Sequence, residues 1–283
     1  RTITLLGNTG TDFVIENGCT LNLNNATMAV AFAFSGINLT GDISGTYNAG
    51  GSTSNVINTT GGTGTLVTVN STGIINNSIV GSSGCLTGSV ATLSFANGSN
   101  YTHGNYTTSN GYIPLATWGA TSNIFITGGT SSTAITNAPG QTLGNFTYNS
   151  STSTSTCSAF TSSTATVIQG NLTILASNTG KFRIVTTGTL TINGNLVVSG
   201  GLAETSNNTG TIIVLGNVSV SGGTFDVAFA STPTLKVAGN FIQTGGNITQ
   251  TSTNGLLEFN GTSAQTLTVL PGVHGTNAIN VKI

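Results

Sequence analysis

The chain has 283 residues and a formal net charge of −1, and only 4% of its residues are charged, against about a quarter in ordinary globular domains. Disordered chains normally combine low hydrophobicity with high net charge, so this composition argues against simple disorder. Such a surface offers no electrostatic attraction for nucleic acid or anionic lipid, and no apolar run is long enough for a helix to cross a membrane.

Residues 1–92 alternate short apolar runs with Gly, Asn, Ser and Thr, but without a strict period. Apolar residues at every second position predict short, half-buried strands. Near the start we expect these side chains to point inward: Phe13, Ile15, Cys19, Leu21 and Leu23. We interpret the segment as irregular coils of the repeat found downstream, with longer insertions, and the Gly-, Ser- and Thr-rich stretch 48–65 as a loop or irregular corner.

Residues 93–163 contain the only Trp and four of the five Tyr of the chain. We expect coils with longer loops that carry these rings. Flat aromatic faces offer a large contact area, and a candidate sugar-stacking platform is formed by Tyr101, Tyr106, Tyr112 and Trp118. The alternative is that the same rings cover the side of the fold beneath a long loop. His103 here, and His274 further on, are isolated and are predicted to be surface or corner residues rather than ligands.

Residues 164–283 repeat regularly. A Gly-Asn pair follows each of four Thr-x-Thr steps, and the pairs advance by 24, 22 and 23 residues: Gly170-Asn171, Gly194-Asn195, Gly216-Asn217 and Gly239-Asn240. Each period holds three short apolar alternations separated by corners of Gly, Asn and Ser. A fixed period of this length indicates a repeat architecture.

These patterns predict an all-β fold, a single-domain parallel β-helix (β-solenoid) with three short strands and about 22–26 residues per coil. No coil can bury its own apolar face, so stacked coils must share one core. Parallel crossovers are nearly always right-handed, so we expect a right-handed solenoid. With roughly 12 coils at about 4.8 Å each, the rod would be about 55–60 Å long.

The corner residues have a physical reason to be Gly and Asn. A sharp turn favours positive φ, which Gly adopts freely and Asn tolerates. Asn at one position of successive coils can also stack its side-chain amides into a hydrogen-bonded ladder. The predicted ladder, which we interpret as structural, consists of Asn171, Asn195, Asn217 and Asn240.

A resemblance to a known group of proteins lies in residues 93–270. It is carried by the phrases LSFANGSNYTHGNYTTSNGYIPLATWGATSNIFITGG, APGQTLGNFTY, GTLTINGNLVVSGG, PTLKVAGNFIQTGG and LLEFNGTSAQTL. They resemble a unit that recurs in very long secreted proteins of Bacteroidota (Flavobacterium-like bacteria). The resemblance implies an extracellular or cell-surface β-helix, often described as adhesin-like and typically exported by the type IX route.

Two columns of charged residues are candidates for chemistry. Glu204 and Asp226 each lie three residues past a Gly-Gly corner on neighbouring coils, which would set two carboxylates roughly 5 Å apart, as in retaining glycosidases. The favoured alternative is that Lys181 neutralises Glu204 on a solvated face, since no His or aromatic subsite accompanies the pair. Lys236 and Glu258 predict an exposed ion pair across coils.

The sequence gives little support for a metal site, a cofactor site or a disulfide framework. Hard cations need six or more oxygen ligands and regular Asp motifs, which are missing, so we expect no metal and no other cofactor. The cysteines Cys19, Cys85 and Cys157 are odd in number and widely spaced, which fits neither a disulfide framework nor a CxxC metal site. Cys19 is expected to be a small buried hydrophobe.

The leading expectation is therefore a non-catalytic extracellular or cell-surface β-solenoid that acts as an adhesin-like stalk or surface structural protein. Since no secretory leader is visible at the start, we expect a mature product or an excised segment. The partners would be surface glycans, another copy of the chain or adjoining segments of a longer one, with no nucleic acid and no membrane insertion.

Three alternatives remain open. A self-assembling filament or sheath is suggested by uncharged segments with strand-like alternation at both ends, because solenoids usually cap their ends with polar or charged residues. Polysaccharide binding or cleavage would use the sites named above. Ice binding would use the Thr-x-Thr steps, but Gly or Pro in the middle of three of the four steps suggests that these Thr lie at a corner.

Overall fold

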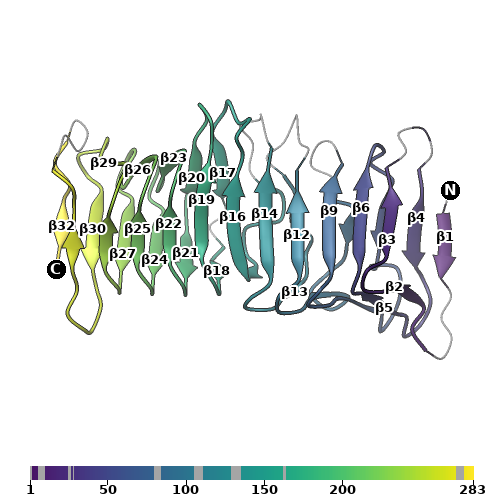
Figure 1. Ribbon diagram of the computed structural model, residues 1–283. Coiled ribbons are helices and arrows are strands. Elements are labelled where there is room, and N and C mark those ends of the chain that lie inside the picture. The colour runs from purple at the N-terminus through teal and green to yellow at the C-terminus, as the bar shows by residue number, and fades with distance from the viewer. Residues whose placement is uncertain are drawn as a thin grey trace.

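The computed structural model describes residues 2–5, 10–24, 27, 29–79, 84–104, 111–128, 135–161, 164–271 and 277–283. This part of the chain is all-β and contains no helix, and every strand pairing in it is parallel. The strands stack as a β-solenoid of about 10 turns with about 24 residues per turn, drawn out from one terminus to the other (Figure 1). The predicted fold class is confirmed.

Each turn contributes to three faces, named here A, B and C in chain order. Face A holds two sheets: β1 (Thr2–Leu5), β4 (Ala31–Phe34), β7 (Val56–Asn58) and β10 (Leu86–Thr87), then β17 (Cys157–Phe160), β20 (Phe182–Val185), β23 (Leu202–Glu204), β26 (Thr224–Asp226) and β29 (Asn247–Thr249). Between them, among the residues that the structure describes, a bridge from Tyr112 to Thr136 marks the face.

Face B also holds two sheets. They are β2 (Phe13–Ile15), β5 (Thr40–Ile43), β8 (Leu66–Val69), β11 (Leu93–Phe95) and β13 (Thr117–Trp118), then β15 (Thr142–Leu143), β18 (Thr166–Ile168), β21 (Thr189–Ile192), β24 (Thr211–Val214), β27 (Thr234–Val237), β30 (Leu256–Phe259) and β32 (Val281–Lys282).

Face C is one unbroken eleven-stranded sheet that runs through all three sequence segments. It contains β3 (Thr20–Leu23), β6 (Thr46–Gly50), β9 (Ile74–Ser78), β12 (Asn100–His103), β14 (Asn123–Thr127), β16 (Asn145–Asn149), β19 (Leu172–Ala176), β22 (Leu196–Val198), β25 (Val218–Val220), β28 (Phe241–Gln243) and β31 (Leu267–Thr268).

Coil length varies along the rod, whose turns number about 10 rather than the roughly 12 predicted. Asn48 and Asn76, paired on face C, are 28 residues apart, whereas Asn123 and Asn145 are only 22 apart. The stretch 48–65, expected as a loop, contains β7, which pairs with strands on both sides. About ten turns at one strand spacing give a rod of about 50 Å.

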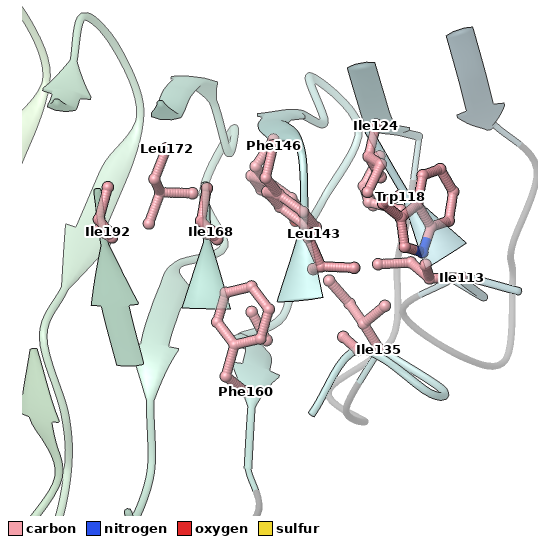
Figure 2. Packing of buried hydrophobic residues seen from close by; sticks show 14 of the residues in the cluster. Ile113, Trp118, Ile124, Ile135, Leu143, Phe146, Phe160, Ile168, Leu172 and Ile192 are labelled. Carbon is pink, nitrogen blue, oxygen red and sulfur yellow. The ribbon is translucent and has the colours of Figure 1, made fainter. Parts of the chain in front are cut away.

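The core forms because alternate side chains of every strand face the interior. On face C the strand register aligns one such position in consecutive turns, and its buried residues are Tyr47, Ile75, Tyr101, Ile124, Phe146, Leu172, Leu196, Val218 and Phe241. Figure 2 shows part of this packing, with Phe146 near Phe160 and Leu143. Each side chain therefore packs on those one turn before and after it, and the core is continuous along the rod.

The Gly-Asn corners need glycine for a reason that differs from the predicted one. Positive φ occurs at the second glycine of the Ser-Gly-Gly and Thr-Gly-Gly corners (Gly201, Gly223 and Gly246; φ 71°, 66° and 65°), not at the Gly-Asn pairs. At Gly216 the constraint is close approach. A Cβ there would lie 2.5 Å from the Gly194 carbonyl oxygen and 2.7 Å from Asn195 Oδ1.

We expect Gly216→Ala to destabilise the protein by about 1–3 kcal/mol, because the added methyl group forces apart two coils joined by a 3.0 Å backbone hydrogen bond from Gly216 to Gly194. Gly104→Ala is the matched control, since its Cβ would meet only the rotatable Thr127 hydroxyl, at 3.1 Å, and a backbone atom at 3.9 Å. Thermal unfolding followed by circular dichroism compares them. Equal melting temperatures would contradict this account of the corner.

Candidate functional site

The asparagine ladder lies at the corner where the chain enters face C. The four predicted residues occupy equivalent positions in successive coils. The Oδ1 atoms of Asn171, Asn195 and Asn217 each accept a hydrogen bond from the backbone N–H of the next asparagine, at 2.8 Å. The predicted alignment is present, but the bonds join side chain to main chain rather than amide to amide.

The ladder also begins earlier than predicted. Asn145 Oδ1 accepts from the Asn171 N–H at 2.9 Å, and the amides of Asn145, Asn123 and Asn100 are joined side chain to side chain at 3.1 and 3.2 Å. Its other end is the N–H of Thr266, which donates to Asn240 Oδ1. The pair Gly144-Asn145, 26 residues before Asn171, is the sequence signal that could have extended it.

Glu204 and Asp226 are register partners on β23 and β26, as the predicted column requires. They do not lie on a solvated face, however, because only 1% of Glu204 and 8% of Asp226 is exposed. The Glu204 carboxylate accepts from Arg183 Nε at 2.6 Å and pairs with Lys181 Nζ at 3.3 Å. The predicted contact with Lys181 is therefore present, and Arg183 is the partner that the sequence did not reveal.

Asp226 makes hydrogen bonds within its own coil and to the following coil. Its carboxylate accepts from the Ala228 N–H at 3.0 Å and from both the N–H and the hydroxyl of Thr251. The two carboxylates are thus each held by their own partners. Phe229 lies over the cations, with Lys181 Nζ 4.1 Å from the centre of its ring, a distance typical of a cation–π contact.

A second set of charges runs along face B. Lys236 Nζ lies 3.4 Å from Glu258, as predicted, and Lys282 Nζ lies 2.8 Å from the other oxygen of the same carboxylate. The hydrogen bond from Lys282, together with Lys236, holds the pKa of Glu258 below its usual range. The predicted pair is present, and Lys282 extends it to an ion ladder over three coils.

The predicted sugar-stacking platform is wrong for the residues that can be placed. Tyr101 is fully buried and Tyr112 and Trp118 nearly so, with Phe95 stacked on the Trp118 ring at 4.0 Å. Their ring faces are packed inside the solenoid and cannot meet a sugar. Tyr106 lies outside the described residues, as does His274.

His103 is also buried, contrary to the expectation of a surface or corner residue. It occupies an inward position of β12, where its Nδ1 accepts from the Tyr112 N–H at 2.6 Å and its Nε2 lies 3.3 Å from the Ile79 carbonyl oxygen. Burial lowers the pKa of His103 to about 4. The imidazole is therefore neutral at pH 7. It connects Ile79, which directly follows β9 on face C, with Tyr112 on face A.

All three cysteines are free thiols. Cys85 and Cys157 are buried, and burial raises the pKa of both thiols. Cys19 is exposed, so its expected burial was wrong. Its N–H donates to the Glu16 carbonyl in a turn, and the inward alternation of Leu21 and Leu23 does not extend back through that turn.

The threonine steps form only a short array. Thr189, Thr211 and Thr234 are register partners on face B. Thr166, however, pairs with Leu190 and is buried. The outward column therefore spans three coils.

A cleft of about 510 Å³ opens on face B where its two sheets are interrupted, between β13 and β15. Two glutamine side chains span this break. Gln141 Oε1 accepts from the Ala116 N–H and from Trp118 Nε1, at 3.3 and 3.2 Å. Gln169 lies one coil beyond Gln141 and two coils beyond Trp118, and its Nε2 donates to the Trp118 carbonyl at 3.1 Å. No sequence signal pointed to this cleft, because it results from a missing pairing rather than from a motif.

Within the described ranges, no group of three or more His, Cys, Asp or Glu side chains is placed to hold a metal ion. The same part of the chain has no helix that could span a membrane. No protein-family model matches the chain, and no curated protein or solved structure is significantly similar to it.

Replacing Asn217 tests whether its side chain bonds to the main chain of the next coil, as observed, or amide to amide, as predicted. Because only its Oδ1 bonds to the next coil, Asn217→Asp should retain the hydrogen bond, whereas Asn217→Ala should cost about 0.5–1.5 kcal/mol. Asn123, in contrast, donates from its amide nitrogen to Asn100. Asn123→Asp removes this donor and should therefore destabilise the protein, unlike Asn217→Asp. Chemical unfolding of the three variants measures this, and equal losses for Asn217→Asp and Asn217→Ala would contradict the observed bonding.

The His103 environment predicts a pH dependence of stability. Its pKa is about 4 in the folded protein and about 6.5 when unfolded, so protonation favours the unfolded chain. The contribution is fully present above pH 6.5 and is lost as the pH falls toward 4, by about 2–4 kcal/mol. Unfolding free energies at pH 7 and pH 4 should differ less for His103→Gln than for the wild type. An unchanged difference would mean that His103 does not titrate in this way.

Proposed function

We propose that the chain is a non-catalytic β-solenoid of an extracellular or cell-surface protein, in which it serves as an adhesin-like stalk or surface structural element. The observation that carries the proposal is the unbroken eleven-stranded sheet of face C, which links every turn of the rod. A continuous parallel ladder over a shared core resists bending and extension, and stiffness and length are what a stalk supplies.

The outer surface fits the same role. Side chains on the outside of the strands are mostly hydroxyls and amides, and several are joined from coil to coil, as in the ladder of Asn22, Asn48 and Asn76. With 4% charged residues, such a surface binds no polyanion by electrostatics. The resemblance of residues 93–270 to secreted repeat proteins adds support for an extracellular location.

The contacts of the two candidate carboxylates support a structural role. Glu204 is held by Arg183 and Lys181, and Asp226 by Thr251 and a backbone N–H. A glycosidase pair needs one proton-donating acid and one free carboxylate facing the same bond. These two groups are instead directed to different coils, where they join neighbouring strands.

Removing one whole coil tests the stalk. Deletion of 189–210 brings Thr211 to the place of its register partner Thr189, and Asp226 to the place of Glu204 beside Arg183. We expect a folded rod, shorter by about 4.8 Å, that still supports attachment when displayed on intact cells. A matched deletion of 189–199 breaks the register and should abolish folding. Loss of attachment by the folded short rod would overturn the proposal, as would antibody labelling of producing cells only after permeabilisation.

A second candidate, the self-assembling filament, is favoured by the ends of the described solenoid. One end presents a groove lined by apolar residues that include Phe241, Leu267 and Val281, and the other a groove lined by Phe13 and Leu21. Open strand edges beside apolar surface favour end-to-end pairing. Electron microscopy with light scattering separates the two candidates, since fibres with a repeat of about 50 Å support the filament and monomeric rods support the stalk.

A further inference from the structure

The cleft between β13 and β15 is a feature that the proposed stalk does not require. It lies on face B, between the five-stranded sheet that ends at β13 and the seven-stranded sheet that begins at β15. The two strands beside it are only two residues long. We propose that this cleft binds a short segment of a neutral glycan.

The cleft is held open by the structure around it. Trp118 is the last inward residue of the five-stranded sheet, and Figure 2 shows its indole next to Ile113 and Ile124. The side chains of Gln141 and Gln169 bond to main-chain groups of β13 and the residue before it. The cleft is therefore preformed, and main-chain groups at its β13 edge are hydrogen-bonded to the two glutamine side chains. Its volume, about 510 Å³, falls in the range of small-molecule sites.

The chemistry of the lining selects an uncharged, hydroxyl-rich ligand. Among the described residues that line the cleft, none is acidic, basic or a histidine. A charged ligand would lose water there without gaining a counter-charge. The polar groups are hydroxyls of Thr117 and Thr142 and the two glutamine amides. An amide nitrogen has two N–H groups, so Gln169 can donate to a sugar hydroxyl while it holds the Trp118 carbonyl.

One wall of the cleft is apolar and open to solvent. Val90 is 66% exposed and Leu115 is 40% exposed, and both line the cleft with Pro139. Sugars present C–H faces as well as hydroxyl edges, and a mixed wall of this kind can receive both. A peptide strand fits less well, because the Ala116 N–H and the Trp118 carbonyl, which it would need for pairing, are already bonded to the glutamines.

The test uses the whole chain and its single tryptophan as an internal probe. Fluorescence of Trp118 and isothermal calorimetry follow titration with cellohexaose, laminarihexaose, xylohexaose and N-acetylchitohexaose, with hexagalacturonate as the acidic comparison. We expect saturable one-to-one binding of at least one neutral hexasaccharide and none of the acidic one. Absence of binding by all four neutral sugars, or equal binding of hexagalacturonate, overturns the proposal.

Variants locate the binding in the cleft. Thr142→Arg fills the cleft from an exposed position and should weaken binding at least tenfold. Thr191→Arg is the matched control, since Thr142 and Thr191 lie in the same outward column with Val167 between them, and Thr191 does not line the cleft. The double variant Val90→Ser and Leu115→Ser removes the apolar wall at exposed positions and should also weaken binding. Unchanged affinity in both cleft variants, with melting temperatures retained, contradicts the assignment but leaves the proposed stalk untouched.

Discussion

Every described turn of this protein is hydrogen-bonded to the next through the parallel ladder of face C, so each residue paired in a sheet has a fixed neighbour one coil away. That spacing decides which side chains can be used. An inward position must fit the apolar side chain above and below it, as Ile124 does between Tyr101 and Phe146. A corner position must fit the neighbouring corner, and for this reason Gly216 has no room for a Cβ. The strict downstream period follows from this requirement.

The same requirement explains where polar groups are used. At the corner into face C, the ladder of asparagines supplies an acceptor for a backbone N–H that turns away from the strand pairing, once per coil. On face A, two buried carboxylates lie in adjacent coils, and each is neutralised or hydrogen-bonded by a different neighbour, Arg183 on one side and Thr251 on the other. Polar side chains thus join coils where main-chain pairing alone leaves groups unsatisfied.

Regular stacking fails in one region, and the unusual features of the molecule are concentrated there. In the described part of this region, face A consists of the bridge from Tyr112 to Thr136, and face B is interrupted between β13 and β15. In these coils a buried histidine and two glutamine side chains take over hydrogen bonds that strands make elsewhere. The interruption creates both the pH-sensitive His103 environment and the cleft for which we propose a glycan. A stiff stalk with one such side cleft would combine reach with recognition.

Local pattern determined the fold class, the three-strand coil, the alignment of the four asparagines and the pairing of Lys236 with Glu258, because these depend only on alternation and on a constant period. Tertiary structure decided the rest. Tyr101 and Trp118 were predicted to offer their ring faces to a sugar, yet their register places them in the core. Arg183 became the partner of Glu204 because register set it one coil away, 21 residues earlier in sequence. The cleft arises where neighbouring coils do not pair, and no single stretch of sequence encodes that absence.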